Sequence, residues 1–372
     1  MLKINGHRVS LRLYQTKNDL MRMRLFIFGL ITTLCLTSCG SRDDEFTDDG
    51  SVDSCLNFGE SQLTLSIQES FTTLPAKVSV FFKVNDNQGN AVSGLLSGNF
   101  RVFERGRNDD CFNEISNTES SAAISPNSQI FTNSTFLVLD LSNSVLQGSL
   151  EQLQQAAISF IDNVFLAQNS TSFTMGIYWF DGEDVLHLLQ PQTSSVDALT
   201  TAVNGITTDI SNDPSTDLFG AIIKSTDLAE QTITSFEDDG IFAAASIVIF
   251  TDGTDQAARF TEEEALDRVN NADENINFFT IGLGSEIDEE TLADVGISGS
   301  VFASNATELE MAFNAVSADV AGQANSFYFF EYCSPKRDGS GMNDLVIQAF
   351  DSNRQGAIQT AFDATGFSSG CQ

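Results

Sequence analysis

The segment Thr135-Phe-Leu-Val-Leu-Asp-Leu-Ser-Asn-Ser144 joins an apolar run to a cluster of oxygen-bearing side chains. Its first five residues have the length and composition of a fully buried strand. Asp140 follows directly, and Ser142 and Ser144 come at alternate positions after it. A carboxylate and two hydroxyls in this spacing can turn three oxygens toward one hard cation. Taken alone, the residues from Asp140 onward are equally compatible with a turn whose polar side chains cap the next helix.

Apolar runs and helical patterns alternate along the chain on the C-terminal side of this strand. Strands are predicted at 173–180, 185–189 (an edge strand), 246–250, 276–281 and 300–302, and helices at 150–165, 218–229, from 261 and at 306–320. Continuous apolar strands separated by helices are typical of a parallel sheet with both faces covered. Such sheets bind ligands at the carboxyl ends of their strands, which is where Asp140 stands.

Two further motifs supply oxygen donors of the same kind. Thr216 stands just before a helix with an apolar face, and Asp252 follows the apolar strand Ile247-Val-Ile-Phe-Thr251. In this order, the three motifs resemble the metal-ion-dependent adhesion site of the von Willebrand factor A (VWA) family, in which Asp-x-Ser-x-Ser, a distant Thr and a strand-terminal Asp share one divalent ion. The resemblance spans residues 134–323. It implies a doubly wound, mostly parallel, Rossmann-like α/β domain.

The resemblance also implies a metal site and the way in which it works. It assigns five metal ligands: Asp140, Ser142, Ser144, Thr216 and Asp252. Ser142 and Ser144 would coordinate directly, Thr216 would do so in the ligand-bound form, and the two carboxylates would act directly or through water. Because the hydroxyls are neutral, the ion stays electrophilic toward a Glu or Asp carboxylate of a protein partner. Oxygen coordination favours Mg²⁺, with Mn²⁺ or Ca²⁺ as alternatives.

Strand patterns lie on both sides of this domain. Before it, strands are predicted at 63–67, 78–84 and 100–103, and after it at 327–332, 344–350 and 357–362, the last three as a meander. Three strands cannot easily make a domain alone. We therefore predict that residues 59–130 and 325–372 are two parts of one antiparallel β-sandwich, into which the VWA domain, residues 131–324, is inserted.

Residues 1–38 are predicted to be a lipoprotein signal peptide. Arg22 and Arg24 precede an apolar run of about a dozen residues, which is too short to span a bilayer as a helix but fits a signal-peptide core. Leu36-Thr-Ser-Cys39 resembles a bacterial lipobox, which implies that Cys39 carries lipid; an ordinary signal peptide with a chance cysteine is the alternative. Residues 39–58 are predicted to be an acidic tether, similar to the surface-export signals of Bacteroidota lipoproteins.

The remaining cysteines suggest disulfides, because the chain is predicted to be exported. They are Cys55, Cys111, Cys333 and Cys371. Four cysteines allow three connectivities. The pairing of Cys55 with Cys111 and of Cys333 with Cys371 is favoured because each bond then closes a local loop.

Charge and composition limit the function. The 372 residues carry a net charge of -33, and removal of residues 1–38 leaves 12 basic and 50 acidic side chains, a charge of -38. Such a surface repels nucleic acid. His187 is the only histidine after the leader, and no Gly-x-Ser-x-Gly motif accompanies it. We therefore expect a surface histidine and no enzyme activity.

The resulting hypothesis is a surface-exposed outer-membrane lipoprotein, held to the membrane only by its lipid, that binds an acidic protein ligand for adhesion or recognition. The alternative is an envelope assembly component, or a secretion or gliding scaffold, that uses the same metal site. The two hypotheses differ in the partner protein, not in the chemistry of the site.

Overall fold

The computed structural model describes residues 51–116, 123–125, 131–168, 173–336 and 341–368. The chain divides into two compact units, 1–46 and 47–372, and all described residues belong to the second. The predicted signal peptide, Cys39 and most of the predicted tether lie outside the described residues. Within the described part of the chain, no helix combines the length and the apolarity needed to cross a membrane.

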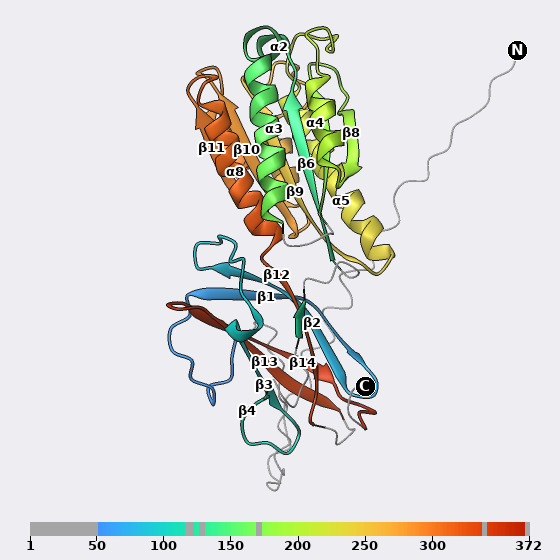
Figure 1. Ribbon diagram of the computed structural model, residues 1–372, viewed down its shortest axis with the longest axis vertical. Coiled ribbons are helices and arrows are strands. Elements are labelled where there is room, and N and C mark those ends of the chain that lie inside the picture. Colours follow the sequence, from blue (N-terminus) through green and yellow to red (C-terminus); the bar gives the residue numbers. More distant parts are fainter. Residues whose placement is uncertain (1–50, 117–122, 126–130, 169–172, 337–340, 369–372) are drawn as a thin grey trace, which may run out of the picture. The chain divides into compact units, whose positions relative to one another are not determined.

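A six-stranded sheet forms the centre of the α/β domain (Figure 1). Its spatial order is β11 (Gly299–Ala303), β10 (Ile276–Leu283), β9 (Phe242–Thr251), β6 (Phe131–Asp140), β7 (Phe173–Phe180) and β8 (His187–Thr193). Five strands run parallel, and only β8 is antiparallel to its neighbour. The edge strand predicted at 185–189 therefore exists but begins two residues later.

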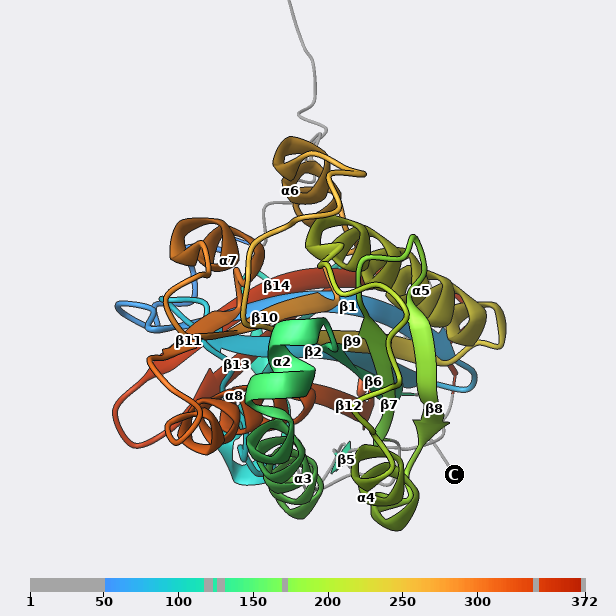
Figure 2. The same cartoon turned by 90° about the horizontal axis from the view of Figure 1, so that it is seen from above.

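Helices cover both faces of this sheet (Figure 2). One face carries α3 (Leu150–Ala167), α4 (Val196–Asn204) and α8 (Leu309–Ala324), and the other carries α5 (Leu218–Asp238), α6 (Glu262–Asn270) and α7 (Glu289–Val295). In β6, Leu137 and Leu139 pack on the first face while Phe136 and Val138 pack on the second. Successive side chains of a strand point to opposite faces, which is why residues 136–139 of this strand are all apolar.

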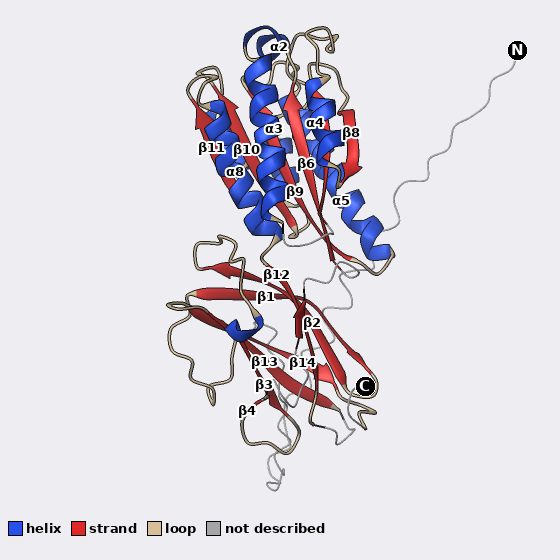
Figure 3. Ribbon diagram, in the orientation of Figure 1, coloured by secondary structure: helices blue, strands red, loops and turns tan. Residues whose placement is uncertain are grey.

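Two four-stranded sheets form the β-sandwich (Figure 3). The first has the order β1 (Leu63–Thr73), β2 (Lys77–Asp86), β12 (Phe327–Cys333), β5 (Ala123–Ser125), and the second β14 (Gln355–Asp363), β13 (Met342–Phe350), β3 (Phe100–Arg105), β4 (Asn113–Glu114). Each sheet pairs a strand from before the α/β domain with one from after it, β2 with β12 and β3 with β13. The predicted fold class, an α/β domain inserted into an antiparallel sandwich, is confirmed.

The predicted C-terminal meander is wrong, because β12 lies in a different sheet from β13 and β14. Both faces of β12 are apolar: Tyr328 and Phe330 face the sandwich core, whereas Phe327 and Phe329 join a second cluster. Phe81 of β2 belongs to that second cluster and is paired in register with Phe329. Packing in these two clusters buries both faces of β12.

The second cluster joins the sandwich to the α/β domain. The Phe81 ring lies 4.9 Å from that of Phe242 at the start of β9, and the Phe327 ring lies 4.9 Å from that of Phe131 at the start of β6. Ala244 of β9 also belongs to this cluster. Aromatic packing therefore connects the two domains at the amino ends of the central strands, away from the carboxyl ends that the sequence analysis marked as the ligand edge.

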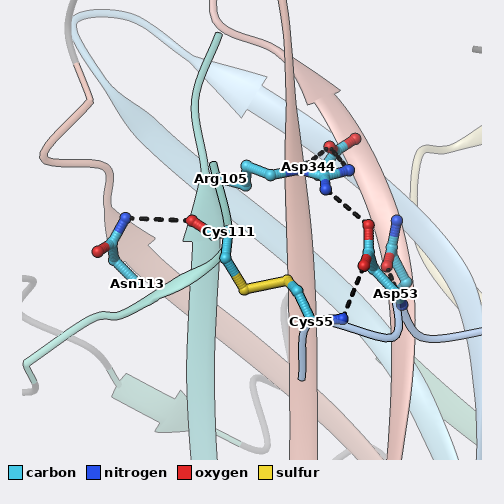
Figure 4. Close-up of a disulfide and its surroundings, with 7 residues drawn as sticks. Asp53, Cys55, Arg105, Cys111, Asn113 and Asp344 are labelled. Atoms are coloured by element: carbon cyan, nitrogen blue, oxygen red, sulfur yellow. Dashed lines mark hydrogen bonds and ion pairs between the residues drawn. A yellow bond between two sulfur atoms is a disulfide. The ribbon is translucent and has the colours of Figure 1, made fainter. Parts of the chain in front are cut away.

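A disulfide joins Cys55 to Cys111, the pair favoured from the sequence (Figure 4). Beside it, Arg105 forms ion pairs with Asp53 and Asp344, each at 2.6 Å. Cys333 is also disulfide-bonded, while its predicted partner Cys371 lies outside the described residues. The covalent bond and the ion pairs together hold the segment that precedes β1 against β3 and β13.

Candidate metal centre

The first motif lies at the carboxyl end of β6, in the middle of the central sheet (Figure 1). Asp140 is the last residue of β6 and is fully buried. Its Oδ1 accepts a hydrogen bond from the Ser142 amide (2.8 Å), and its Oδ2 accepts one from the Thr251 hydroxyl (2.7 Å). Ser142 is the N-cap residue of the short helix α2 (Asn143–Gly148), without a side-chain capping hydrogen bond. The two hydrogen bonds to Asp140 thus hold the carboxylate in one orientation.

Three of the predicted ligands touch one another close to this carboxylate. The Ser142 and Ser144 hydroxyl oxygens are 3.2 Å apart, and the Ser144 hydroxyl donates to Asp252 Oδ1 at 2.7 Å. Neighbouring ligands of an octahedral Mg²⁺ are about 3.0 Å apart, given its bond lengths of about 2.1 Å. Ser142 is buried, Ser144 is exposed and Asp252 is partly exposed, so this oxygen cluster reaches from the interior to the surface. The spacing and the oxygen-only chemistry both fit a divalent cation.

Backbone hydrogen bonds bring the segment of Thr216 to the same edge. The Asn143 amide donates to the Pro214 carbonyl at 3.2 Å, which ties the first motif to this segment. The Thr216 carbonyl accepts from the amides of Gln256 (2.8 Å) and Ala257 (3.1 Å) in the loop that follows Asp252. Thr216 itself is buried. Segments about 75 and 110 residues from Asp140 are therefore assembled by their main chains, as in other open α/β sheets.

The electrostatics of the two carboxylates also favour a cation. Burial raises the pKa of Asp140 to about 7, and the neighbouring Asp252 contributes to this rise, while hydrogen bonds from Thr251 and Ser142 oppose it. Burial also raises the pKa of Asp252, with a smaller contribution from Glu286 and against the hydrogen bond from Ser144. When both acids are ionised, their negative charges lie close together in a poorly solvated place, and a divalent ion would compensate them.

Residues that support the site were missed in the sequence analysis. Thr251 orients Asp140, and Asp217, also buried, accepts a hydrogen bond from the Lys224 ammonium at 3.0 Å. Lys224 forms a second ion pair with Asp184 at 2.7 Å. Thr251 directly precedes one predicted ligand and Asp217 directly follows another. Polar residues next to ligands commonly orient them. Their position next to predicted ligands could therefore have identified Thr251 and Asp217 from the sequence.

Comparisons with known proteins give one family match and several distant structural similarities. Residues 136–318 match the family model of the von Willebrand factor type A domain. Among solved structures, BatB from Bacteroides thetaiotaomicron is 18% identical, with a TM-score of 0.40, and the match covers 52% of this chain and 99% of that one. A von Willebrand factor type A protein from Catenulispora acidiphila is 9% identical, with a TM-score of 0.42 and coverages of 81% and 74%.

The von Willebrand factor domain of the type V pilus tip protein Mfa5 from Porphyromonas gingivalis is 10% identical, with a TM-score of 0.39, covering 50% of this chain and 94% of that one. No curated protein matches the chain. The family model spans β6 to α8 and includes all five predicted ligands. This chain therefore contains a von Willebrand factor type A domain, whose strands carry the candidate metal centre at their carboxyl ends.

Proposed function

We propose that the VWA domain binds a divalent cation, most favourably Mg²⁺, and through it a carboxylate of a protein partner. The five ligands would be Asp140, Ser142, Ser144, Thr216 and Asp252. The observation that carries the proposal is the contact of the Ser142, Ser144 and Asp252 oxygens beside a buried carboxylate, Asp140, to which the Ser142 amide is bonded. A cation at this place would have the buried carboxylate of Asp140 on its inner side and the exposed Ser144 on its outer side.

Each side chain has a separate task in this proposal. The bound ion supplies an electrophilic position for an incoming carboxylate oxygen. Asp140, already oriented by two hydrogen bonds, supplies negative charge from the buried side. Ser142 and Ser144 supply neutral oxygens, so they hold the ion without fully neutralising it. Asp252 orients Ser144 through their 2.7 Å hydrogen bond and adds the second negative charge.

The role that follows is that of a binding module for adhesion or recognition, without a catalytic step. Binding through a metal needs only an open coordination position and a partner with a Glu or Asp carboxylate. An envelope assembly, secretion or gliding scaffold would use the same chemistry and is the alternative. Partners recovered with the protein would separate the two: host or matrix proteins support adhesion, and envelope components support a scaffold.

The test is a binding screen against extracellular and envelope proteins, carried out in Mg²⁺ and in EDTA. We expect each genuine partner to be lost in EDTA and with Asp252→Asn. EDTA removes the metal ion, and the substitution removes one of its proposed ligands, so in both cases the carboxylate of the partner has no ion to bind. Glu286→Gln is the matched control: it removes an exposed negative charge near Asp252 that is not a proposed ligand, and it should bind like wild type. Binding that persists in EDTA would refute the mechanism.

We also propose that Cys39 anchors the protein to the outer membrane as a surface-exposed lipoprotein. The support is the lipobox-like Leu36-Thr-Ser-Cys39, followed by a segment with five acids between Gly40 and Gly50. Diacyl chains together with an N-terminal acyl group exceed what stable anchoring requires. Cells fed an alkyne fatty acid should label the wild-type protein and not a Cys39→Ser variant. An unlabelled wild-type protein would rule the anchor out.

A further inference from the structure

We propose that the domain holds a second divalent-cation site, formed by Asp181, Glu183 and His187, which takes a borderline transition metal such as Zn²⁺ or Ni²⁺. Each residue offers one ligand atom, and the three atoms lie within 4.8 Å of one another. None of them belongs to the five proposed ligands around Asp140. The inference stands on these three residues and does not depend on the proposed function.

The β7–β8 hairpin brings the three residues together. Asp181 directly follows β7, and His187 is the first residue of β8. The two strands pair Trp179 with His187, and their rings stack with centroids 3.9 Å apart and planes at 11°. The connection between the strands, residues 181–186, is short, so the imidazole of His187 lies beside the acids that follow β7. The stacked indole fixes the plane of that imidazole.

The distances fit a metal polyhedron. His187 Nε2 is 3.3 Å from Glu183 Oε2 and 3.9 Å from Asp181 Oδ1. Bonds of about 2.1 Å in a tetrahedron separate neighbouring ligands by about 3.4 Å. In the described part of the chain, the buried Nε2 atom has no hydrogen-bond partner. A metal placed among the three atoms would satisfy this nitrogen and neutralise both carboxylates.

The site is also organised in advance. Asp181 is fully buried, and its Oδ2 accepts hydrogen bonds from the Ser211 hydroxyl (2.7 Å) and the Asp213 amide (3.3 Å). Its Oδ1 accepts from the Glu183 amide at 2.8 Å. Outer partners of this kind hold ligands in place and tune their affinity. The Glu183 side chain is 38% exposed and that of His187 22%, so the cluster lies close to the protein surface.

The ligand types separate this site from the first one. An imidazole with two carboxylates suits Zn²⁺, Ni²⁺ or Cu²⁺, whereas an oxygen-only set suits Mg²⁺. The sites are nonetheless adjacent, because the Asp181 carbonyl accepts from the Asp217 amide at 2.8 Å, and Asp217 follows the proposed ligand Thr216. An ion at Asp181 would therefore brace the segment that carries Thr216.

Trp179 makes the test specific, since it is the only tryptophan of the chain and is stacked on His187. The full chain, stripped of metal and then placed in excess Mg²⁺, is titrated with Ni²⁺ while tryptophan emission is recorded. Ni²⁺ bound by His187 quenches the adjacent indole. We expect saturable quenching that Zn²⁺ reverses by competition. Absence of saturable quenching would overturn the proposal.

Three variants test whether the Ni²⁺ that quenches Trp179 is bound at this site. Glu183→Gln removes one ligand from a partly exposed position, and it should raise the Ni²⁺ concentration at half-quenching by at least about tenfold. Asp184→Asn is the matched control, because this neighbouring acid pairs with Lys224 instead. Asp140→Asn should also respond like wild type. Unchanged quenching in Glu183→Gln, or lost quenching in Asp140→Asn, would place the ion elsewhere and refute the site.

Discussion

Asp140→Asn is expected to abolish the stabilisation of the protein by Mg²⁺. Wild type should gain about 2.7 kcal/mol of unfolding free energy when Mg²⁺ is present at 100 times its dissociation constant. The variant keeps the size of the side chain but loses the buried negative charge beneath the oxygen cluster. Thermal unfolding in Mg²⁺ and in EDTA measures the difference, with Glu286→Gln as the control that should behave like wild type. A variant with the wild-type Mg²⁺ response would exclude Asp140 as a ligand.

The same pair of proteins should differ in how stability depends on pH when metal is absent. The folded pKa of Asp140 is about 7, above the ordinary 3.8 of the unfolded chain. Between these values the folded state binds more protons than the unfolded state, so this group lowers stability as pH rises from about 4 to above 7. The full effect corresponds to about 4 kcal/mol.

Asp140→Asn lacks this contribution. In EDTA it should therefore become more stable than wild type at pH 8, and the advantage should shrink toward pH 4. Urea unfolding at a series of pH values gives the two curves. Parallel curves would mean that Asp140 is not the buried acid that titrates between these pH values.

Glu104→Leu is expected to destabilise the sandwich by about 3–5 kcal/mol. Glu104 of β3 is fully buried and accepts hydrogen bonds from the side chains of Ser334 (2.7 Å), Asn343 (3.0 Å) and Tyr332 (3.1 Å). Burial raises the pKa of this carboxyl, while those three hydrogen bonds and Lys336 oppose the rise. Leucine would remove the acceptor of the Tyr332 hydroxyl and of the Asn343 amide, and the shorter of the two hydrogen bonds that Ser334 donates. Each buried donor left without an acceptor is costly.

Two further variants test whether the loss of stability comes from the lost hydrogen bonds or from the change of Glu to Leu in a strand. Glu104→Gln keeps an acceptor oxygen, and the Ser and Tyr hydroxyls can rotate to accept from the amide, so its cost should be about 1–2 kcal/mol. Glu114→Leu makes the same chemical change on neighbouring β4, where the side chain is 57% exposed. It should alter stability by less than about 0.5 kcal/mol. Chemical unfolding followed by circular dichroism ranks the three variants; equal costs for Glu104→Leu and Glu104→Gln would contradict the network.

The sequence alone predicted the α/β domain and its ligand edge because both are encoded locally. A strand segment buried on two faces is a continuous apolar run, as residues 136–139 of β6 are, and its end is marked by the polar residues that follow. Asp140, Ser142 and Ser144 lie within five residues, so their proximity follows from the chain itself. Thr216 and Asp252 were placed with them through the family resemblance, and backbone hydrogen bonds bring their segments to that edge.

Only the tertiary structure decided which strands pair across long distances and which polar groups the pairing buries. The nearly continuous apolar run of β12 indicates that it has two apolar faces, but not that Phe81 of β2 lies opposite Phe329. Glu104 reads as an ordinary strand acid until β12 and β13 close over it. His187 was predicted to be a surface histidine, yet the hairpin register stacks it on Trp179 beside Asp181. Register and burial depend on contacts between distant segments, and a local pattern does not specify those contacts.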